Sequence, residues 1–382
     1  PFLKSLTKKS IYYEKVNPSI GFCERSEIFT GKKSLDLGFL TAINLSKYSP
    51  YKKVKYFNII IHYFFKFFNI NILDKIIRRI LWKYSKLIGS PMYPQNIPLN
   101  KLHLFALTED RNKYNETNNF KFKTIFDLAK ENKISINYDA FTSLNYEITF
   151  SEEKRIKILF NTIHDYDMCL LYLDEADRIG HSFGPYSREI LDSCSNIDLK
   201  IKKIYDYLEK NIKNYQLLII GDHGMEQVTH KYDIISKLNK IFKENNININ
   251  KNIEYFVDST ILRIWIKNKS NYRKIFKILT NDKFFNKVGK FITPMKIVDK
   301  QNDFSNYGDI IWWINLNNII DPSFFSNNKK CKGMHGYLDK NISKGTALYY
   351  NSEINNNKIV NKINLNELFI HFSDYINSND KN

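Results

Sequence analysis

The sequence predicts an α/β fold with a mainly parallel sheet, and an alternation of elements in its middle region indicates this. Residues 167–177 form a short apolar stretch that ends in acids, and residues 216–220 form a second apolar stretch. A helical pattern lies between them. Strand, loop, helix and strand in this order are typical of parallel strands joined by crossover helices. With 382 residues, 43% of them hydrophobic, the chain can form one large domain of this class, with or without an insertion.

Each predicted element has its own pattern. The first helix is predicted after residue 195, because five apolar residues recur there at helical spacing: Ile197, Ile201, Ile204, Leu208 and Ile212. Further along, the patterns predict strands over 260–266, 309–316 and 345–350, and helices over 272–279 and 364–376. The sequence shows no internal repeat.

Residues 51–104 differ from the rest and are predicted to be a helical, aromatic and basic insertion or lid in a catalytic domain formed by 1–50 and 105–382. Polar residues interrupt the insertion, so it does not resemble a membrane span of about 20 apolar residues. One interpretation is a helical insertion packed on the main domain. The other is an interfacial helix over 54–88 that makes peripheral contact with a lipid or anionic surface.

The charge balance favours anionic partners. Lys and Arg number 58 against 40 Asp and Glu, which gives a formal charge of +18. Phosphates or a membrane surface would fit this balance. A general bias of composition towards Lys, Asn, Ile, Tyr and Phe explains it equally well. Nucleic acid is not favoured as a partner, because no recognised DNA- or RNA-binding motif is present.

The cysteines and the first residues say little about location. Cys23, Cys169, Cys194 and Cys331 form no CxxC pair, so a disulfide framework is not expected. The chain opens with Pro1 and a Lys-rich stretch rather than a signal peptide. We expect that an N-terminal part is missing, and a cytoplasmic or membrane-peripheral location is favoured only weakly over others.

Three separated stretches place acids and histidines near the ends of predicted strands. They contribute Asp177 with His181, Asp222 with His223, and His335 between two glycines. In an α/β sheet, ligands bind beyond the carboxyl ends of the strands. Mixed histidine and carboxylate ligands suit zinc better than magnesium or calcium. A single histidine of this kind is usually a hydrogen-bonded loop residue, but three such stretches together predict a metal site.

These stretches also carry a family resemblance. "YLDEADRIGHSFGP", "IIGDHGM" and "MHGYLDKN" followed by "GTALYY", in that order, resemble the alkaline phosphatase superfamily. They are most similar to its type I phosphodiesterase/nucleotide pyrophosphatase branch, over residues 15–50 and 120–376. The resemblance implies an α/β/α sandwich of three layers, and two divalent metal ions, both zinc in that family.

The resemblance also implies a distribution of ligands. Asp177, His181 and His335 match the ligands of one zinc ion, and Asp222 and His223 match ligands of the other. The remaining ligand of the family is an Asp after the first strand, and no equivalent is found here. This fits the expected absence of an N-terminal part.

The position of the family's nucleophile is unusual. Family members carry Thr or Ser, or a modified Cys in the related sulfatases, nine residues before the Thr of a Thr-Gly pair. Here the pair is Thr30-Gly31, and Gly21 stands nine residues earlier. Glycine offers no nucleophile, so the resemblance fails at this position.

Three alternatives follow for the attacking group. A shifted loop would bring Cys23 to the metal, where a helix N-terminus and a nearby cation would lower the pKa of its thiol. Ser19 could attack instead, activated by the metal. In the third alternative water attacks directly. Arg25 lies where sulfatases carry an Arg that helps to hold the active-site oxyanion.

The function predicted from the residues and the resemblance is metal-assisted hydrolysis of phosphate esters, with a phosphodiester as the first choice. Two alternatives stay open. One is a transferase that moves a phospho-headgroup between lipid and glycan. The other is a non-catalytic relative that binds a phosphorylated ligand, which would explain both Gly21 and the missing Asp.

Overall fold

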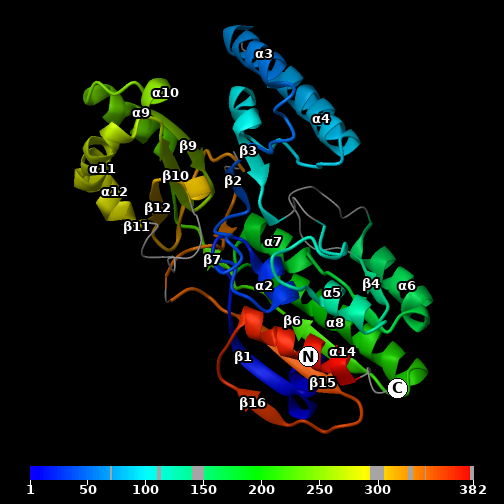
Figure 1. Ribbon diagram of the computed structural model, residues 1–382. Coiled ribbons are helices and arrows are strands. Elements are labelled where there is room, and N and C mark those ends of the chain that lie inside the picture. Colours follow the sequence, from blue (N-terminus) through cyan, green and yellow to red (C-terminus); the bar gives the residue numbers. More distant parts are fainter. Residues whose placement is uncertain are drawn as a thin grey trace.

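A computed structural model of the chain describes the structure of residues 1–68, 71–109, 113–139, 150–292, 305–325, 330–339 and 341–378. Two sheets, each with its own helices, make up most of it, and a pair of helices lies outside both sheets (Figure 1). The short elements outside these parts are the N-terminal helix α1 (Phe2–Leu6) and the strands β2 (Ile43–Leu45), β3 (Phe105–Leu107), β7 (Glu226–Gln227), β8 (His230–Tyr232), β13 (Asn318–Ile320) and β14 (Gly333–Met334).

The larger sheet is mixed rather than mainly parallel. Its strand order is β16 (Lys358–Val360), β1 (Ile11–Asn17), β15 (Gly345–Asn351) and β6 (Gln216–Ile220), and β17 (Ile363–Asn364) also pairs with β1. The late strand β15 enters between β1 and β6 and runs antiparallel to both, whereas β16 and β17 run parallel to β1. The sequence pattern identifies β15 as a strand but carries no information about its direction.

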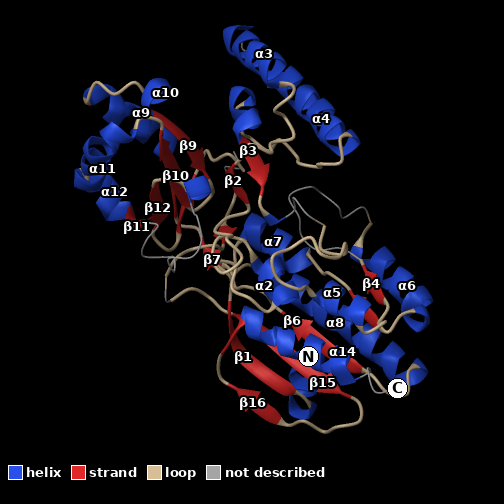
Figure 2. Ribbon diagram, in the orientation of Figure 1, coloured by secondary structure: helices blue, strands red, loops and turns tan. Residues whose placement is uncertain are grey.

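Helices cover both faces of the strands that lead to the predicted metal ligands. α6 (Glu152–Thr162) and α8 (Arg188–Asn211) form a cluster with Leu217 of β6 on one face. The helices near the other face are α2 (Glu24–Thr30), α5 (Ile125–Glu131) and α14 (Phe369–Ser378), whose apolar residues pack in a cluster with Ile220. Figure 2 shows these helices around the sheet. The α/β class is therefore as predicted.

The strands β5 and β6 are not hydrogen-bonded to each other. β5 (Met168–Leu170) pairs in parallel with β4 (Ile136–Tyr138), and β6 pairs with β15. Successive residues of β5 point into the same two clusters that β6 enters. Among the described residues neither strand has a partner on its second edge, and their apolar side chains are half-buried.

The second sheet is fully antiparallel. Its order is β11 (Gly289–Ile292), β12 (Ile310–Ile314), β10 (Ile261–Ile266) and β9 (Ile253–Val257). Of these elements the sequence predicted β10, β12 and the helix over 272–279, and they form a separate lobe rather than part of the main sheet. Their helices are α9 (Ile234–Glu244), α10 (Ile249–Asn252), α11 (Tyr272–Asn281) and α12 (Lys283–Val288).

The predicted insertion is helical and lies outside both sheets (Figures 1 and 2). It forms α3 (Lys55–Phe68) and α4 (Asn71–Leu87), and residues 69 and 70 lie outside the described part. Ile61 of α3 and Leu81 of α4 pack into the core of the antiparallel lobe. No helix within the described ranges is both long and apolar enough to cross a membrane. The division into two domains stays an expectation.

Candidate metal centre

Three chain segments bring the predicted ligands to one place. α7 (Glu175–Phe183) carries Asp177 and His181, whose spacing of four residues puts both on one face of the helix. Asp222 and His223 follow β6 after one residue, Gly221, and His335 follows β14 directly. The ligands lie near the carboxyl ends of β5 and β6, the edge at which an α/β sheet binds its ligands.

The distances match a metal site. From Oδ1 of Asp177, the Nε2 atoms of His181, His335 and His223 lie at 3.4, 3.8 and 3.9 Å. Bonds of about 2.1 Å in a tetrahedral zinc site put neighbouring ligand atoms roughly 3.4 Å apart. Asp222 Oδ1 lies 3.8 Å from His223 Nε2. The ligand atoms of Asp177, His223 and His335 all lie within 4.8 Å of one another, and His181 and Asp222 each lie close to one member of this group. The two ligand sets that the family resemblance separates here share one cluster.

Backbone carbonyls orient two of the rings. His181 Nδ1 is 2.9 Å from the carbonyl oxygen of Gly333, and His223 Nδ1 is 3.0 Å from that of Gly224. In the tautomer with its proton on Nδ1, the ring donates a hydrogen bond to the carbonyl oxygen. The lone pair of Nε2, on the side of Asp177, is then available to bind a metal. Such outer hydrogen bonds are typical of histidines that bind metals.

Two buried atoms at the centre lack hydrogen-bond partners within the described part of the chain. They are Oδ1 of Asp177 and Nδ1 of His335. A buried carboxylate oxygen without a partner costs free energy, and a cation would remove that cost. The donor set and the orphaned carboxylate oxygen together fit a divalent cation such as zinc.

The protonation of the histidines differs. Burial, together with His223 and His181, lowers the pKa of His335 well below its usual value, so this ring is neutral and ready to bind a metal. Burial also opposes the charged form of His223, but Asp222, Glu24 and Asp177 outweigh it and raise its pKa to about 9. A metal must therefore displace a proton from His223, which makes metal affinity weaker at lower pH.

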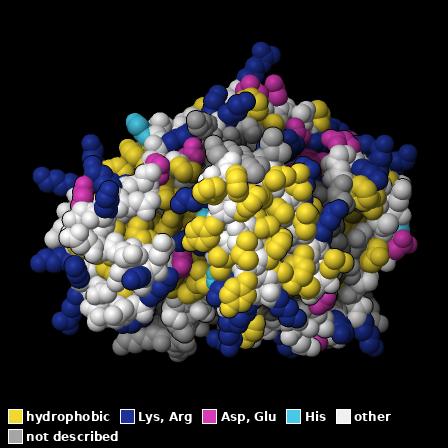
Figure 3. All heavy atoms as spheres, turned by 90° about the horizontal axis from the view of Figure 1, so that it is seen from above, with side chains coloured by type: hydrophobic (Ala, Val, Ile, Leu, Met, Phe, Trp, Pro, Cys, Tyr) yellow, Lys and Arg dark blue, Asp and Glu magenta, His cyan; other side chains and the backbone are white. Residues whose placement is uncertain are grey.

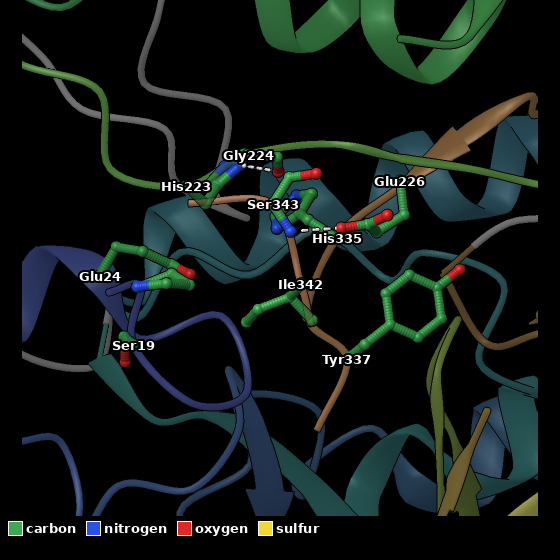
Figure 4. Close-up of a pocket in the computed structure, with 11 residues that line it drawn as sticks. Ser19, Glu24, His223, Gly224, Glu226, His335, Tyr337, Ile342 and Ser343 are labelled. Atoms are coloured by element: carbon green, nitrogen blue, oxygen red, sulfur yellow. Dashed lines mark hydrogen bonds between the residues drawn. The ribbon is translucent and has the colours of Figure 1, made fainter. Parts of the chain in front are cut away.

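Glu24 is a site residue that the sequence analysis missed. It is the first residue of α2, and it lines a small cavity of about 20 Å³ together with Ser19, His223 and His335 (Figure 4). Burial raises the pKa of its carboxyl to about 8. From the sequence alone, Glu24 is predicted only to be an acid in the first turn of a helix. Its position three residues after Gly21, in the loop expected to hold the nucleophile, was the signal that could have identified it.

The nucleophile loop has no room for a side chain at Gly21. Its φ is +68°, and a Cβ there would collide with the carbonyl oxygen of Leu40. The thiol of Cys23, two residues on, is fully buried and does not line the cavity. Burial, with added repulsion from Glu109, raises the pKa of Cys23 well above its usual value. This is the opposite of the lowered pKa expected for a thiolate, because the position is enclosed and its charged neighbours are mainly acidic.

Of the other two predicted catalytic residues, one lines the cavity and one does not. Ser19 lines the cavity, and its hydroxyl is 3.3 Å from both the carbonyl oxygen of Ile20 and the hydroxyl of Ser34. Arg25 belongs to α2 and is buried, with its guanidinium 3.9 Å from Glu109 and 4.9 Å from the centre of the Tyr114 ring. Arg25 does not line the cavity.

Comparison with curated proteins gives several short matches. The chain is 40% identical over 70 residues to ectonucleotide pyrophosphatase/phosphodiesterase family member 1 of Homo sapiens, which covers 18% of this chain and 8% of that protein. It is 37% identical over 65 residues to a venom phosphodiesterase of Macrovipera lebetinus, with 16% and 8% covered. It is 29% identical over 106 residues to GPI ethanolamine phosphate transferase 2 of Candida glabrata, with 28% and 12% covered. These matches span only a small part of each relative.

Two solved structures share the fold. Both are murine ectonucleotide pyrophosphatase/phosphodiesterase 5, one of them an inactive variant in complex with AMP. The complex has a TM-score of 0.62 at 14% identity, and the alignment covers 99% of this chain and 89% of that one. The other has a TM-score of 0.63 at 14% identity, with 99% and 90% covered. The arrangement is thus an alkaline phosphatase-like fold, as the motifs predicted.

A family model settles the relationship over a longer stretch. The model described as "Type I phosphodiesterase / nucleotide pyrophosphatase" matches residues 80–338, more than half of the chain and all of the region that carries the five predicted ligands. The resemblance deduced from the motifs is therefore confirmed. The chain belongs to the type I phosphodiesterase/nucleotide pyrophosphatase family.

Proposed function

We propose that the chain is a metal-dependent hydrolase of phosphate esters, with a phosphodiester as its substrate and zinc as its metal. The observation that carries the proposal is the convergence of His181, His223 and His335 on one orphaned oxygen of Asp177. The family membership and the similarity to phosphodiesterases support the same reaction. Two ions, as the family resemblance implies, remain part of the proposal.

The residues of this chain would hold the metal and control protons around the phosphate. A divalent cation in this site supplies positive charge that stabilises the negative charge developing on the phosphoryl oxygens. Glu24 faces the same cavity, and with a pKa of about 8 its carboxyl can hold or accept a proton near neutral pH. We propose water as the attacking group, because Gly21 has no side chain and Cys23 is enclosed.

Metal content and turnover test the proposal together. The protein should copurify with zinc, or bind it when added, and hydrolyse bis(p-nitrophenyl) phosphate faster than p-nitrophenyl phosphate. Asp177→Ala should lower kcat/KM by about a thousandfold and remove most of the bound metal, because the shared oxygen is lost. His164→Ala is the matched control, since His164 is exposed and takes part in none of the ion pairs of the cluster. An Asp177→Ala protein that keeps both its metal and its activity would refute the site.

The attacking group has a separate test. Ser19→Ala should leave kcat within about threefold of the wild type if water attacks. Loss of turnover with metal content unchanged would transfer the role to Ser19. Cys23→Ala should alter the stability of the fold rather than the chemistry, because the sulfur is buried beside α2.

A second candidate is a protein that binds a phosphorylated ligand without turning it over. Gly21 favours it, because the backbone there excludes any nucleophilic side chain. Titration calorimetry with AMP distinguishes the two, since a non-catalytic relative would bind the ligand in a metal-dependent way while all nitrophenyl esters stay intact. A transferase, as in the relative from Candida glabrata, would instead release nitrophenol faster when an alcohol acceptor such as glycerol is added.

A further inference from the structure

The outer side of α3 is almost entirely apolar. Its inner side packs Ile61 and Phe65 against the core, whereas the residues that point away are exposed: Tyr56 at 76%, Ile60 at 68% and Phe67 at 82%. The outer face of α3 is defined here by its exposed apolar residues, which are Tyr56, Phe57, Ile60, Tyr63, Phe64, Phe67 and Phe68. A helix that is apolar on all sides is normally buried on all sides.

The outer side of α4 combines an apolar stripe with a basic stripe. Leu73, Ile76, Ile80 and Leu87 are exposed, with Leu87 at 86%. The basic stripe beside them is also exposed and consists of Lys75, Arg79, Lys83 and Lys86. Both stripes follow helical spacing, so each runs along one side of the helix. The inner side, with Ile77, Leu81 and Tyr84, packs on the core of the antiparallel lobe.

The two outer sides form one surface. Because each helix packs its inner side on the same core, the outer sides both point away from it. Figure 3, viewed from the end of the molecule where α3 and α4 lie, shows hydrophobic side chains gathered in a broad area, with Lys and Arg around it. Contiguous apolar areas of this kind on a protein surface mark interaction sites.

The charges around this surface are of one sign. Residues 52–88 contain nine Lys and Arg and a single acid, Asp74. The carboxylate of Asp74 is 2.6 Å from Nε of Arg78, so the charges of these two residues neutralise each other. The surface therefore combines exposed aromatic rings with an uncompensated basic border, which is the composition of helices that lie flat in a lipid interface.

We propose that the outer faces of α3 and α4 dock on the surface of an anionic lipid bilayer, with the helices in the plane of the interface. Aromatic and aliphatic side chains of α3 would enter the boundary of the acyl chains, and the basic stripe of α4 would contact the headgroups. A second copy of the chain fits less well, because a two-fold contact would place the basic borders against each other. This inference does not depend on the proposed function.

Vesicle flotation tests the docking surface. The wild-type protein should float with vesicles of phosphatidylcholine and phosphatidylserine, and bind vesicles of phosphatidylcholine alone at least about tenfold more weakly. Ile60→Asp combined with Phe67→Asp should abolish binding to both. Lys75→Glu combined with Arg79→Glu should remove at least about tenfold of the preference for phosphatidylserine, because two headgroup contacts become repulsive.

The controls use side chains exposed to a similar degree elsewhere. Tyr186 is 82% exposed and Leu199 is 63% exposed, so Tyr186→Asp with Leu199→Asp should float like the wild type. All these residues lie on the surface, and circular dichroism should show unchanged folding. The proposal is overturned if the wild type binds neither kind of vesicle. It is also overturned if the wild type binds no lipid and sedimentation shows that it is a dimer, while the Ile60→Asp/Phe67→Asp protein is a monomer. That result would assign the surface to a second copy of the chain.

Discussion

Two strands of similar hydrophobicity, β10 and β6, differ sharply in how they are packed. All six residues of β10 are buried, whereas the four apolar residues of β6 are only half-buried. β10 has β9 on one edge and β12 on the other, while β6 pairs only with β15 among the described strands. The metal ligands follow the less enclosed strand. The fully buried strand and the predicted metal ligands therefore lie in different lobes of this molecule.

The charged groups of the two lobes also differ in what they contact. In the antiparallel lobe, Arg263 lies 3.2 Å from Asp258, and both side chains are shielded from solvent. Near the metal centre, Lys200 of α8 lies 2.7 Å from Glu152 and 2.5 Å from Glu175. Glu152 in turn accepts hydrogen bonds from the backbone at the start of α7, the helix that carries two of the ligands.

The largest expected loss of stability comes from breaking the buried pair. Arg263→Ala leaves Asp258 buried without its partner, and we expect the free energy of unfolding to fall by about 4 kcal/mol. Urea unfolding followed by circular dichroism measures it. Arg79→Ala, on the exposed side of α4, is the control and should change stability by less than about 0.5 kcal/mol. A loss below about 1 kcal/mol in Arg263→Ala would show that the lobe does not depend on this pair.

A matched truncation compares the two strands directly. Ile264→Ala in β10 should cost about 3 kcal/mol, because it leaves a cavity in a fully enclosed position. Ile219→Ala in β6 should cost about half as much, since less of that side chain is removed from water. The same unfolding experiment measures both. Equal losses would mean that β6 is enclosed as tightly as β10 in solution.

Zinc should stabilise only the lobe that carries the ligands. Zinc at about one hundred times its Kd should raise the free energy of unfolding of the wild type by about 2.7 kcal/mol. His335→Ala should show little of this gain, whereas Ile264→Ala should keep it. Thermal unfolding with and without a chelator is the measurement. Equal stabilisation of the His335→Ala protein would place the bound zinc elsewhere.

A smaller loss than in Arg263→Ala or Ile264→Ala is expected from the ion cluster below α7. Lys200→Met should cost about 2 kcal/mol at neutral pH, because it leaves two largely buried acids without their cation. It should also weaken zinc binding modestly, since Glu152 holds the start of α7.

The pH dependence of that loss follows from Glu175. Burial raises its pKa, but the hydrogen bond from Lys200 and the other contacts outweigh this and lower it overall. A carboxyl whose pKa is lower in the folded protein stabilises above its unfolded pKa, and the contribution is lost as the pH falls through the folded value. The difference between wild type and Lys200→Met should therefore be full at neutral pH and shrink below about pH 4. A difference that grows on acidification would contradict this assignment.

Much of the site could be predicted from the sequence because its ligands follow apolar stretches directly. Asp222 and His223 stand just after β6, beyond Gly221, and the spacing of Asp177 and His181 matches one turn of α7. The helices of the insertion were predicted from composition in the same way. The separate antiparallel lobe was not predicted, because an apolar stretch such as 260–266 looks the same in a parallel or an antiparallel sheet.

By itself the sequence determined which side chains could bind a metal, where several of the strands and helices lie, and to which family the chain belongs. These properties depend on residues that are close together along the chain. The sequence did not determine the ends of the elements, since the helix predicted from residue 195 begins at Arg188. Only the tertiary structure decided that Cys23 is enclosed, that the backbone at Leu40 excludes a side chain at Gly21, and that Glu24 enters the cavity. Burial and steric exclusion depend on segments that approach from elsewhere in the chain, and no local pattern records such approaches.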